Sequence, residues 1–467
     1  MAVQIYNSLT KKKEEFIPID NNTVKMYTCG VTVYDQCHIG HARSLYVFDV
    51  IRCYLHFRGF KVEFVRNITD VDDKIIQKAI ETKKTSKDVS EEQIRLYYED
   101  MNALGVSKAD QEPKATENIP EMVMHIQGLI DKGFAYAVDG DVYFNVRKFN
   151  EYGKLSGQSI EKMLEAVRIE KDSDKKDPLD FALWKSSKPG EPTWDSPWGP
   201  GRPGWHIECS CMSMKYLKTQ TLDIHAGGRD LIFPHHENEI AQSEALTDKL
   251  FSKYWIHHGL LTINGQKMSK SLGNFITIKD ALAQYTADEI KMFFLFSHYI
   301  SAIDFTQEKM QEARKVLAKF DILFWKAAEL LKDREVEAFQ EYFIIRHKQD
   351  FINAMDDDFN TPRALAALFN LINDTNKFID ENKKAPHYLG VVYHAVDVLE
   401  NLGRGVFGLF LKEKEQDLSD DLKRLLDERV AARAAKDFER SDELRDLLRS
   451  KGVAVEDTKA GQTWRWV

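Results

Sequence analysis

His38-Ile39-Gly40-His41 stands where an apolar run, Val24 to Tyr27, gives way to a helix-like stretch from Ala42 to Phe57. The passage from a strand into a helix suits the binding of a nucleoside triphosphate. The four residues alone also fit two surface or capping histidines, so their setting matters as much as their identity.

A second block, Lys267-Met268-Ser269-Lys270-Ser271, lies past the middle of the chain. It follows the apolar residues Leu260 to Ile263 and then Asn264-Gly265, the commonest short hairpin turn. Alone, this block is typical of a solvated basic turn. The two blocks together, in this order and setting, predict that the chain binds a nucleotide from two sides. The first block would do so from the start of a helix and the second from a mobile loop.

The composition is that of a large globular protein. The 467 residues suffice for about three domains, and 43% hydrophobic residues, with 27 Phe, 17 Tyr and 8 Trp, support an extensive core. No apolar stretch reaches the length of a membrane span, and the first residues lack a signal-peptide pattern. Five scattered cysteines do not form a disulfide framework, which favours a reducing, cytoplasmic compartment. The net charge of −9 argues only weakly against a nucleic-acid partner, because RNA can bind a local basic surface.

The hydrophobic pattern of the first part alternates between strands and helices, which is typical of a Rossmann-like α/β fold. Strands are expected over 25–29, 61–67, 141–146, 222–225 and 254–263, and helices over 42–57, 70–81, 91–104 and from about His235. Between about Pro113 and Pro203 the pattern changes to a polar run and a segment dense in Trp, Pro and Gly. This change indicates an insertion between two halves of the fold.

Beyond Thr306 the strand signals disappear. Amphipathic segments over 307–332, 336–354, 361–383 and 388–402 predict a helical bundle. After a charged linker at 412–417, the pattern predicts helices over 419–435 and 438–450 and two strands, 453–456 and 463–466, joined by a turn at Gly461. The chain is therefore expected to end in a small α+β domain.

A second group of residues indicates a metal site. Pro234 is a good helix start, and the spacing of four between His235 and Glu239 puts both on one helix face. Imidazole and carboxylate both bind zinc, although a surface pair is the commoner explanation for this spacing. Cys29, at the end of the first predicted strand, and Cys209 are expected near the start of that helix. A buried cysteine that acts as a small hydrophobe is the alternative for each.

The two signature blocks resemble those of class I aminoacyl-tRNA synthetases, and further blocks narrow the resemblance to cysteinyl-tRNA synthetases. These blocks are Met26–Asp35, Arg66–Lys74, Gly201–Ser210, Phe233–Glu239 and, in the helical part, Asp356–Pro362. The resemblance runs through essentially the whole chain. It implies a nucleotidyl-transferase catalytic domain over 1–306, with a connective insertion at 113–203 and a signature loop and stem-contact region at 265–306. A helical bundle domain over 307–411 and an anticodon-binding domain over 412–467 would follow.

The resemblance also implies roles for individual side chains. His38, His41, Lys267 and Lys270 would act on the phosphates of ATP, which binds with Mg²⁺, and Gly40 and Asp230 would contact its adenosine. A zinc ion would be held by Cys29, Cys209, His235 and Glu239, beside a cysteine pocket formed by Gly30, Thr69, Trp205 and His225. The anticodon would be read by Arg433, Phe438, Asp442 and Asp457, with Phe438 standing where the family often has tryptophan. Packing is an open alternative for Thr69 and Trp205, and Trp464 and Trp466 are expected either to pack in the core or to contact RNA.

Zinc in the amino-acid pocket has a physical reason. Serine is the oxygen isostere of cysteine, and an apolar pocket separates such neighbours by only about 10- to 200-fold. Zinc prefers a soft thiolate and deprotonates a bound thiol, whereas a serine hydroxyl gains little. The metal would thus supply the selectivity that other synthetases obtain by editing. No region of this sequence then has to form an editing domain. A structural zinc with four protein ligands and no exchangeable position is the alternative.

The expected reaction is ATP-dependent formation of cysteinyl-adenylate from L-cysteine, then transfer to the 3′-terminal ribose of tRNA(Cys), by a monomer. A ligase that joins activated cysteine to an amino sugar would share the catalytic domain. Such ligases lack the anticodon-reading end, so Thr306–Val467 favours the tRNA substrate. An inactive paralogue that only binds RNA is disfavoured, because both histidines and both lysines of the signature blocks are present.

Overall fold

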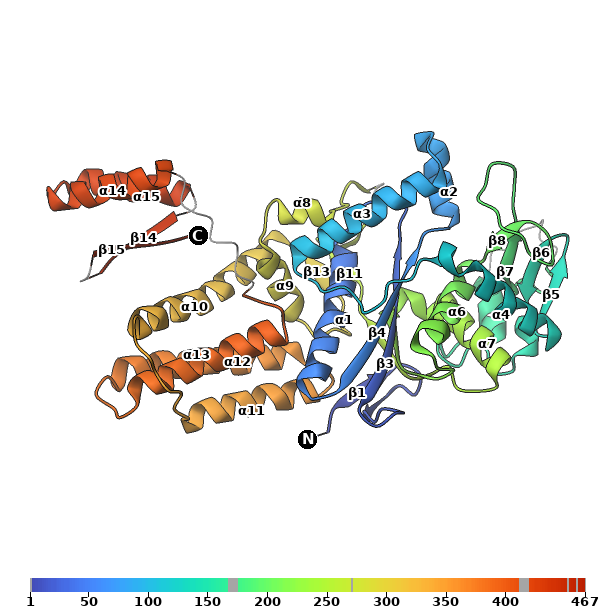
Figure 1. Ribbon diagram of the computed structural model, residues 1–467, viewed down its shortest axis with the longest axis horizontal. Helices are drawn as coiled ribbons and strands as arrows, with labels where there is room; N and C mark the ends of the chain where they lie inside the picture. The colour runs from blue at the N-terminus through green and yellow to red at the C-terminus, as the bar shows by residue number, and fades with distance from the viewer. Residues whose placement is uncertain are drawn as a thin grey trace. The chain divides into compact units, whose positions relative to one another are not determined.

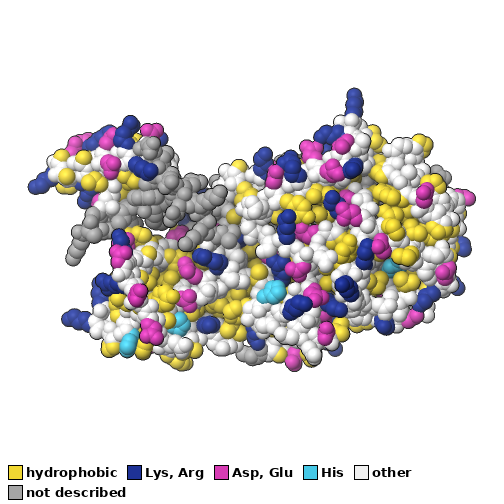
Figure 2. Space-filling view, in the orientation of Figure 1, with side chains coloured by type: hydrophobic (Ala, Val, Ile, Leu, Met, Phe, Trp, Pro, Cys, Tyr) yellow, Lys and Arg dark blue, Asp and Glu magenta, His cyan; other side chains and the backbone are white. Residues whose placement is uncertain are grey.

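The computed structural model describes residues 2–166, 175–269, 272–410, 420–451, 453–458 and 461–466 (Figure 1). They belong to two compact units, Met1–Phe410 and Leu411–Val467. None of the described helices is long and apolar enough to cross a membrane. On the face seen in Figure 2, Lys and Arg side chains are interspersed with Asp and Glu, which agrees with a net charge of only −9.

A parallel sheet of four strands lies at the centre of the larger unit. Its strands run in the order β10 (Ser252–His258), β9 (Leu222–Gly228), β3 (Thr23–Thr32) and β4 (Lys61–Thr69). The predicted strands over 25–29, 61–67 and 222–225 each lie within a longer observed one, and 254–263 divides into β10 and β11 (Leu261–Ile263). Helix α1 (Ile39–Phe57) connects β3 to β4, as the crossover of a parallel pair requires.

Both faces of this sheet are covered, because side chains on β3 alternate between two apolar clusters. Met26 packs into the cluster that contains α1, whereas Tyr27 packs into the cluster with Cys209 on α6 (Trp205–Leu217). Both side chains are 0% exposed. A strand buried on both faces has few polar residues in its sequence, which is why Val24, Met26 and Tyr27, interrupted only by Lys25, are recognisable as a strand.

The pairing of β3 with β4 is irregular near their carboxyl ends. The register shifts between Thr28 and Val31, which leaves Cys29 and Gly30 in a bulge. The Gly30 N–H donates to the side-chain oxygen of Asn67 at 2.8 Å, and a Cβ on Gly30 would lie 1.6 Å from the Asn67 carbonyl oxygen. Only glycine fits at this approach of the two backbones, and the bulge frees Cys29 from regular pairing.

The insertion forms an antiparallel sheet of its own (Figure 1). Its strands are β5 (Ala135–Val138), β6 (Asp141–Phe144), β7 (Phe181–Ser186) and β8 (Gly201–Pro203). Side chains of β5, β6 and β7 share an apolar cluster with α4 (Ile119–Asp131). The sequence predicted only the strand over 141–146. The other strands are too short, and too close to Pro and Gly, to show a clear alternation.

Helices α2 (Asp73–Thr82) and α3 (Ser86–Leu104) follow β4 and end the first half of the catalytic fold. The predicted helices over 70–81 and 91–104 are correct in kind but not in their starts. Caps decide those starts: Asp72 accepts from a backbone N–H of α2, and Thr85 forms a capping box with Asp88 on α3. A short helix, α5 (Ile160–Ala166), lies in the insertion.

The second signature block lies on a small sheet of β12 (Gln266–Lys267), β11 and β13 (Ile303–Phe305). The predicted hairpin turn is present, since Asn264 and Gly265 have φ of 49° and 75°, as a type I′ turn requires. The chain then returns to the start of α1: the Ile39 N–H donates to the Ile276 carbonyl at 3.1 Å, and the Ile278 N–H donates to the Cys37 carbonyl at 2.9 Å. Helices α8 (Ile278–Leu282) and α9 (Ala287–Leu295) complete this region.

Helices α10 (Gln307–Leu331), α11 (Tyr342–Asp356), α12 (Thr361–Glu381) and α13 (Tyr388–Gly405) form the predicted bundle. The expected start of α11 at residue 336 was wrong, because 335–341 is not helical. Asp358, in the turn before α12, accepts from the Tyr6 N–H on β1 (Gln4–Asn7) and from the Tyr299 hydroxyl, each at 2.8 Å. This carboxylate ties the bundle to the α/β part, where β1 pairs with β2 (Lys12–Glu15).

The smaller unit contains α14 (Asp420–Ala434), α15 (Phe438–Ser450), β14 (Val453–Thr458) and β15 (Gly461–Trp466). This is the predicted α+β arrangement, except that Gly461 begins β15 instead of forming the turn. Leucines of both helices pack with Val453 and Val455 in one apolar cluster. Arg429, 0% exposed, binds both oxygens of Asp457 at 3.0 and 2.9 Å and so joins α14 to the hairpin.

Candidate active site

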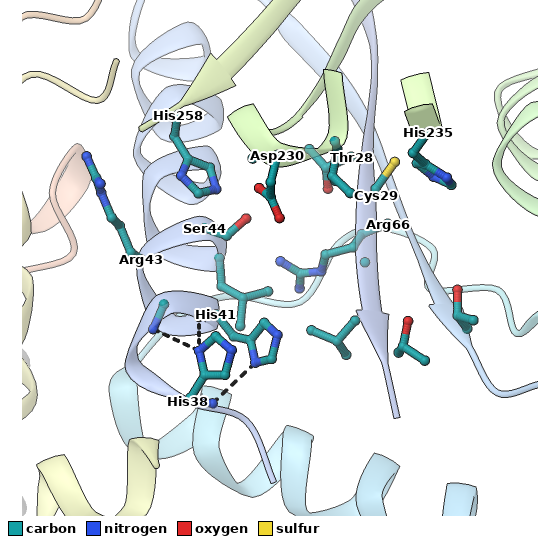
Figure 3. Close-up of a pocket in the computed structure, with 18 of the residues that line it drawn as sticks. Thr28, Cys29, His38, His41, Arg43, Ser44, Arg66, Asp230, His235 and His258 are labelled. Carbon is teal, nitrogen blue, oxygen red and sulfur yellow. Dashed lines mark hydrogen bonds between the residues drawn. The ribbon is translucent and has the colours of Figure 1, made fainter. Parts of the chain in front are cut away.

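The first signature block caps helix α1 with its own histidines (Figure 3). Nδ1 of His38 accepts from the N–H groups of Gly40 at 3.1 Å and His41 at 3.3 Å, and Nδ1 of His41 accepts from the His38 N–H at 3.2 Å. The rings stack with their centroids 3.7 Å apart. Because each Nδ1 accepts, the proton of each neutral ring is assigned to Nε2, which remains a donor. The two histidines can therefore cap the helix through Nδ1 and still donate to a phosphate through Nε2–H.

Both histidines line a cavity of about 380 Å³ at the carboxyl end of the sheet. Burial, reinforced by electrostatic interaction with His38 and Lys74, lowers the pKa of His41 well below its usual value. His41 is therefore neutral at pH 7 and donates a hydrogen bond without adding charge. Positive charge for a bound phosphate must come from other side chains.

The second block borders the same cavity through Lys267 and Met268. A Cβ added to Gly40 would lie 2.9 Å from Cε1 of His38 and 3.6 Å from the Met268 methyl. Glycine at this position thus leaves room for the His38 ring, whereas the distance to Met268 would be an ordinary contact. Lys270 and Ser271 lie outside the described residues, so the role of Lys270 stays a prediction.

Arg43, which the sequence did not single out, links the two blocks. It is 1% exposed on α1, and its guanidinium donates to the backbone carbonyls of Gly259, Leu260, Tyr299 and Ser301 at 2.7, 2.9, 3.1 and 2.5 Å. These carbonyls lie just before β11 and β13, which form one sheet with β12, the strand that contains Lys267 of the second block. Burial lowers the pKa of Arg43 to about 10, so the side chain stays charged at pH 7. An arginine within a mostly apolar helix is the sequence signal that would have pointed to it.

Replacing Arg43 by Met removes these donors and keeps an unbranched apolar side chain. We expect the free energy of unfolding in urea to fall by about 3 kcal/mol, because buried carbonyls lose their partners. Arg95→Met removes an exposed pair with Glu99 on α3 and should change stability by less than about 0.5 kcal/mol. A loss at Arg43 no larger than that at Arg95 would contradict this role.

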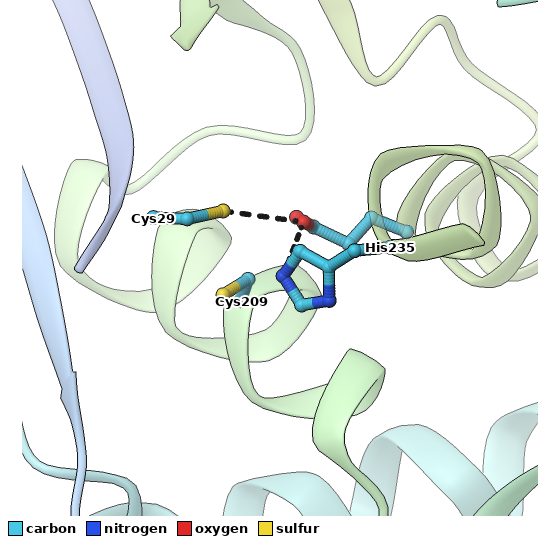
Figure 4. A group of neighbouring side chains, drawn as sticks. Cys29, Cys209 and His235 are labelled. Atoms are coloured by element: carbon cyan, nitrogen blue, oxygen red, sulfur yellow. Dashed lines mark hydrogen bonds and ion pairs between the residues drawn. The ribbon is translucent and has the colours of Figure 1, made fainter. Parts of the chain in front are cut away.

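Four side chains from separate elements meet beside the cavity (Figure 4). The ligand atoms of Cys29 on β3, Cys209 on α6, His235 and Glu239 all lie within 4.8 Å of one another. The helix expected from His235 begins later: His235 lies in an irregular turn, η4 (Ile232–His236), which leads into α7 (Glu237–Thr247). Nε2 of His235 is nevertheless 3.0 Å from Oε1 of Glu239, as the spacing of four predicted.

The charges of this cluster fit a cation. Although burial opposes ionisation, His225 and His235 hold the pKa of Glu239 well below its usual value. Burial also opposes ionisation of Cys209, but a hydrogen bond from Cys29 and the neighbouring His235 lower its pKa to about 6. Two thiols, an imidazole and a carboxylate are all zinc ligands, and two of these groups are anionic at pH 7.

The cluster is open to the cavity, since Cys29, Cys209 and His235 are among the residues that line it. A closed structural site would have no need of that contact. A second possible ligand group, formed by Cys29, His225, His236 and Glu239, shares two donors with the first. His236 belongs to this second group through Nε2, which lies 3.2 Å from Sγ of Cys29, while its Nδ1 lies 2.8 Å from Nε2 of His257.

The predicted cysteine pocket surrounds this cluster. Gly30, Thr69 and Trp205 line the cavity, and the Trp205 ring, 38% exposed, stacks on His235 with centroids 4.2 Å apart. The Thr69 hydroxyl donates to Glu208 at 2.8 Å and accepts from the Asn67 amide at 3.1 Å. Glu208, which is 0% exposed, was not singled out from the sequence, although it lies within the block Gly201–Ser210.

His225 and Asp230 take different positions. Nε2 of His225 is 2.7 Å from Oε2 of Glu239, and its ring stacks on Trp255. His225 is not among the residues that line the cavity within the described chain, so it orients Glu239 from behind. Asp230 lines the cavity just after β9, at the end of the sheet where nucleotides bind in such folds.

Comparison with known proteins adds the decisive observation. A family model described as the class I (C) tRNA synthetase catalytic domain matches residues 15–315, a DALR domain matches 350–412, and a cysteinyl-tRNA ligase anticodon binding domain matches 415–465. A cysteine–tRNA ligase of Persephonella marina is 48% identical and aligns over 100% of both chains. The chain belongs to the cysteinyl-tRNA synthetase family.

Other relatives agree with this assignment. A cysteine–tRNA ligase of Sulfurihydrogenibium sp. is also 48% identical over 100% of both chains. Among solved structures, Mycobacterium tuberculosis methionyl-tRNA synthetase in complex with methionyl-adenylate has a TM-score of 0.66 at 14% identity, covering 83% of this chain and 92% of that one. That likeness shows the fold, and with the family models it confirms the predicted order of a Rossmann-like domain, a helical domain and a small C-terminal domain.

The smaller unit brings together two of the predicted anticodon residues of the cysteinyl-tRNA synthetase family. Arg433 lies 2.7 Å from the Asp457 carboxylate, whose pKa is lowered chiefly by its hydrogen bond with Arg429. Asp442 pairs with Arg445 at 3.2 Å, and Phe438, 60% exposed, lies at the start of α15. The side chains of Trp464 and Trp466 lie outside those that the structure describes. Whether they pack in the core or contact RNA therefore stays a prediction.

Proposed function

We propose that this chain is a cysteine–tRNA ligase that activates L-cysteine with ATP and transfers it to the 3′-terminal ribose of tRNA(Cys). Family membership supports the reaction, and one observation supports the amino acid. The donor cluster of Cys29, Cys209, His235 and Glu239 opens into the same cavity as His38 and His41. A thiol-selective centre thus lies within reach of the nucleotide site.

In the first step the cysteine carboxylate attacks the α-phosphate of ATP, which binds with Mg²⁺, and pyrophosphate leaves. No proton has to move, so the chain contributes position and charge stabilisation. Nε2–H of His38 and His41 would donate to the phosphates, and Lys267 and Lys270 would bind the departing pyrophosphate. Asp230 would accept from the ribose, and Gly40 would leave room for the adenine.

Cys29, Cys209, His235 and Glu239 would hold one zinc ion. When bound there, zinc supplies a soft acceptor for a thiolate, and this is the property that separates cysteine from serine. His225 keeps Glu239 in place, and His206 does the same for His235, with their Nδ1 atoms 3.0 Å apart. Trp205 would close one wall of the pocket, and Thr69, held by Glu208, would position the amino end of the substrate.

The second step needs the tRNA to reach the same cavity. We propose that 1–306 is the catalytic domain, with its insertion at 113–203 and its signature loop and stem-contact region at 265–306, that 307–411 supports it, and that 412–467 reads the anticodon. Arg433, Phe438, Asp442 and Asp457 would contact the bases. Asp457 would do so from a fixed position, because two arginines already hold it.

Phe438→Ala should lower kcat/KM for tRNA by about tenfold, since one aromatic stacking contact with a base contributes about 1–3 kcal/mol. Cysteine-dependent pyrophosphate exchange, which needs no tRNA, should not change. Leu447→Ala is a matched control: Leu447 is an exposed apolar residue of α15, on nearly the opposite helix face. Equal losses for both variants would contradict base stacking at Phe438.

The function is tested by measuring cysteine-dependent exchange of pyrophosphate into ATP, followed by aminoacylation of transcripts with and without the cysteine anticodon. We expect exchange with cysteine but not with serine, loss of exchange in a strong chelator, and charging that depends on the anticodon. Equal activation of serine and cysteine would refute thiol selection. Activation that survives chelation and zinc loss would favour a purely structural zinc, and charging of an amino sugar in place of tRNA would favour the other ligase.

A further inference from the structure

The block Arg66–Lys74 contains a cation to which no role has been assigned. Lys74 is the second residue of α2, just after the turn that follows Thr69 at the end of β4. It lines the same cavity as His41, Thr69 and Trp205. Thr69 and Trp205 border the cysteine end of that cavity, and His41 borders the phosphate end, so Lys74 shares the space where the two substrates must meet.

The acidic side chains around Lys74 have other partners. Asp73 binds Arg202 and lies 2.8 Å from Lys185. Asp72 accepts from the backbone N–H of Lys74 as the helix cap, and Asp35 lies 3.4 Å from Lys78. Within the described parts of the chain, Lys74 forms no ion pair. Its ammonium instead lies 5.3 Å from the centre of the Tyr34 ring, which also lines the cavity.

The other cations that line the cavity differ from Lys74. Arg66 is buried and bound to Glu112 at 2.6 Å, and Arg43 is bound to backbone carbonyls. Lys267 lies on the exposed strand β12 before the signature loop. Among the described residues, Lys74 is therefore the helix-borne cavity cation whose charged group is taken up neither by a carboxylate nor by backbone carbonyls. His41 is neutral, and the guanidiniums of Arg43 and Arg66 are already bound to carbonyls and to Glu112, so the Lys74 ammonium is the helix-held charge left to meet a bound α-phosphate.

We propose that the Lys74 ammonium binds a non-bridging oxygen of the α-phosphate, first in ATP and then in cysteinyl-adenylate. The ammonium keeps its proton throughout and lowers the energy of the charge that builds up on this phosphate in both steps. The proposal rests on the proposed function, because it takes adenylate formation as the reaction. Lys74 would then be a catalytic residue beside the two histidines, positioned by Tyr34.

The test compares Lys74→Met, Lys74→Arg and the control Lys84→Met in the full-length protein. Lys74 is exposed, so the fold should tolerate these changes, and Lys84 pairs with Glu92 at the surface of the α2–α3 turn. For Lys74→Met we expect the kcat of cysteine-dependent pyrophosphate exchange to fall by about 10²-fold, with the KM for cysteine within about threefold of the unaltered protein. Single-turnover transfer from preformed cysteinyl-adenylate to tRNA should fall by at least about tenfold. Lys74→Arg should recover part of both rates, and Lys84→Met should change neither.

Two results would overturn the inference. Exchange by Lys74→Met within about threefold of the unaltered protein would show that the ammonium does not act on the α-phosphate. If only transfer to tRNA fell, Lys74 would be assigned to the RNA terminus instead. The proposed function is judged separately on the unaltered protein: if that protein failed to activate cysteine, both proposals would be refuted.

Discussion

Cys209→Ser should abolish zinc binding, with the metal content falling from about one per chain to about zero, and should lower kcat/KM for cysteine in pyrophosphate exchange by about 10³-fold. Serine keeps the size of the side chain but does not ionise near neutral pH, whereas the Cys209 thiol, with a pKa of about 6, does. The remaining donors are too few to hold the ion firmly. Metal content is measured by elemental analysis of the purified protein.

The same helix offers a matched control. Cys211, two residues further along α6, is buried in an apolar cluster, and burial raises its pKa to about 12. Cys211→Ser should keep its zinc and lose less than about threefold in kcat/KM, although the buried hydroxyl costs about 1 kcal/mol or more of stability. If both variants lost zinc equally, or if Cys209→Ser kept it, the proposed ligand set would be wrong.

His41→Asn should lower the kcat of pyrophosphate exchange by about 10²- to 10³-fold while the KM for cysteine stays nearly constant. Asparagine places an acceptor close to Nδ1 of the imidazole, so the cap on the His38 N–H is kept. The Nε2–H donor is lost. The variant therefore separates the capping role of His41 from its role towards phosphate.

His41→Gln is the complementary variant. Glutamine places an amide near the position of Nε2 but loses the acceptor near Nδ1, so it should retain more exchange activity than His41→Asn and have a less stable α1. Because burial keeps His41 neutral, the unaltered protein should show no loss of exchange from protonation of this ring as the pH falls from 8 to 6. If His41→Asn had the activity of the unaltered protein, the histidine would only be a cap.

Parts of the metal cluster left local signals in the sequence, and the family resemblance supplied the full set with Cys209. The side chains of His235 and Glu239 lie close together, as their spacing of four predicted, although α7 begins only at Glu237. The turn η4, which contains His235, leads directly into that helix. Cys29 was recognisable at the end of an apolar run. Its juxtaposition with Cys209 follows from the packing of α6, which contains Cys209, against β3.

Other features could not be predicted because their partners are remote in the sequence. Arg43 is satisfied by carbonyls more than 200 residues away, and nothing near it in the sequence indicates them. Glu208 is buried only because α6 packs against β4, where Thr69 lies. The insertion was recognised by its composition, but its sheet was mostly missed because strands such as Gly201–Pro203 are too short to show a period.

The central claim is that zinc in the Cys29, Cys209, His235 and Glu239 cluster reads the thiolate of the substrate. X-ray absorption at the zinc edge of the purified protein tests it most directly, with and without L-cysteine and with L-serine as the control. We predict that cysteine adds one sulfur neighbour to the two supplied by Cys29 and Cys209, and that serine adds none. A zinc spectrum that does not change when cysteine binds would contradict the claim.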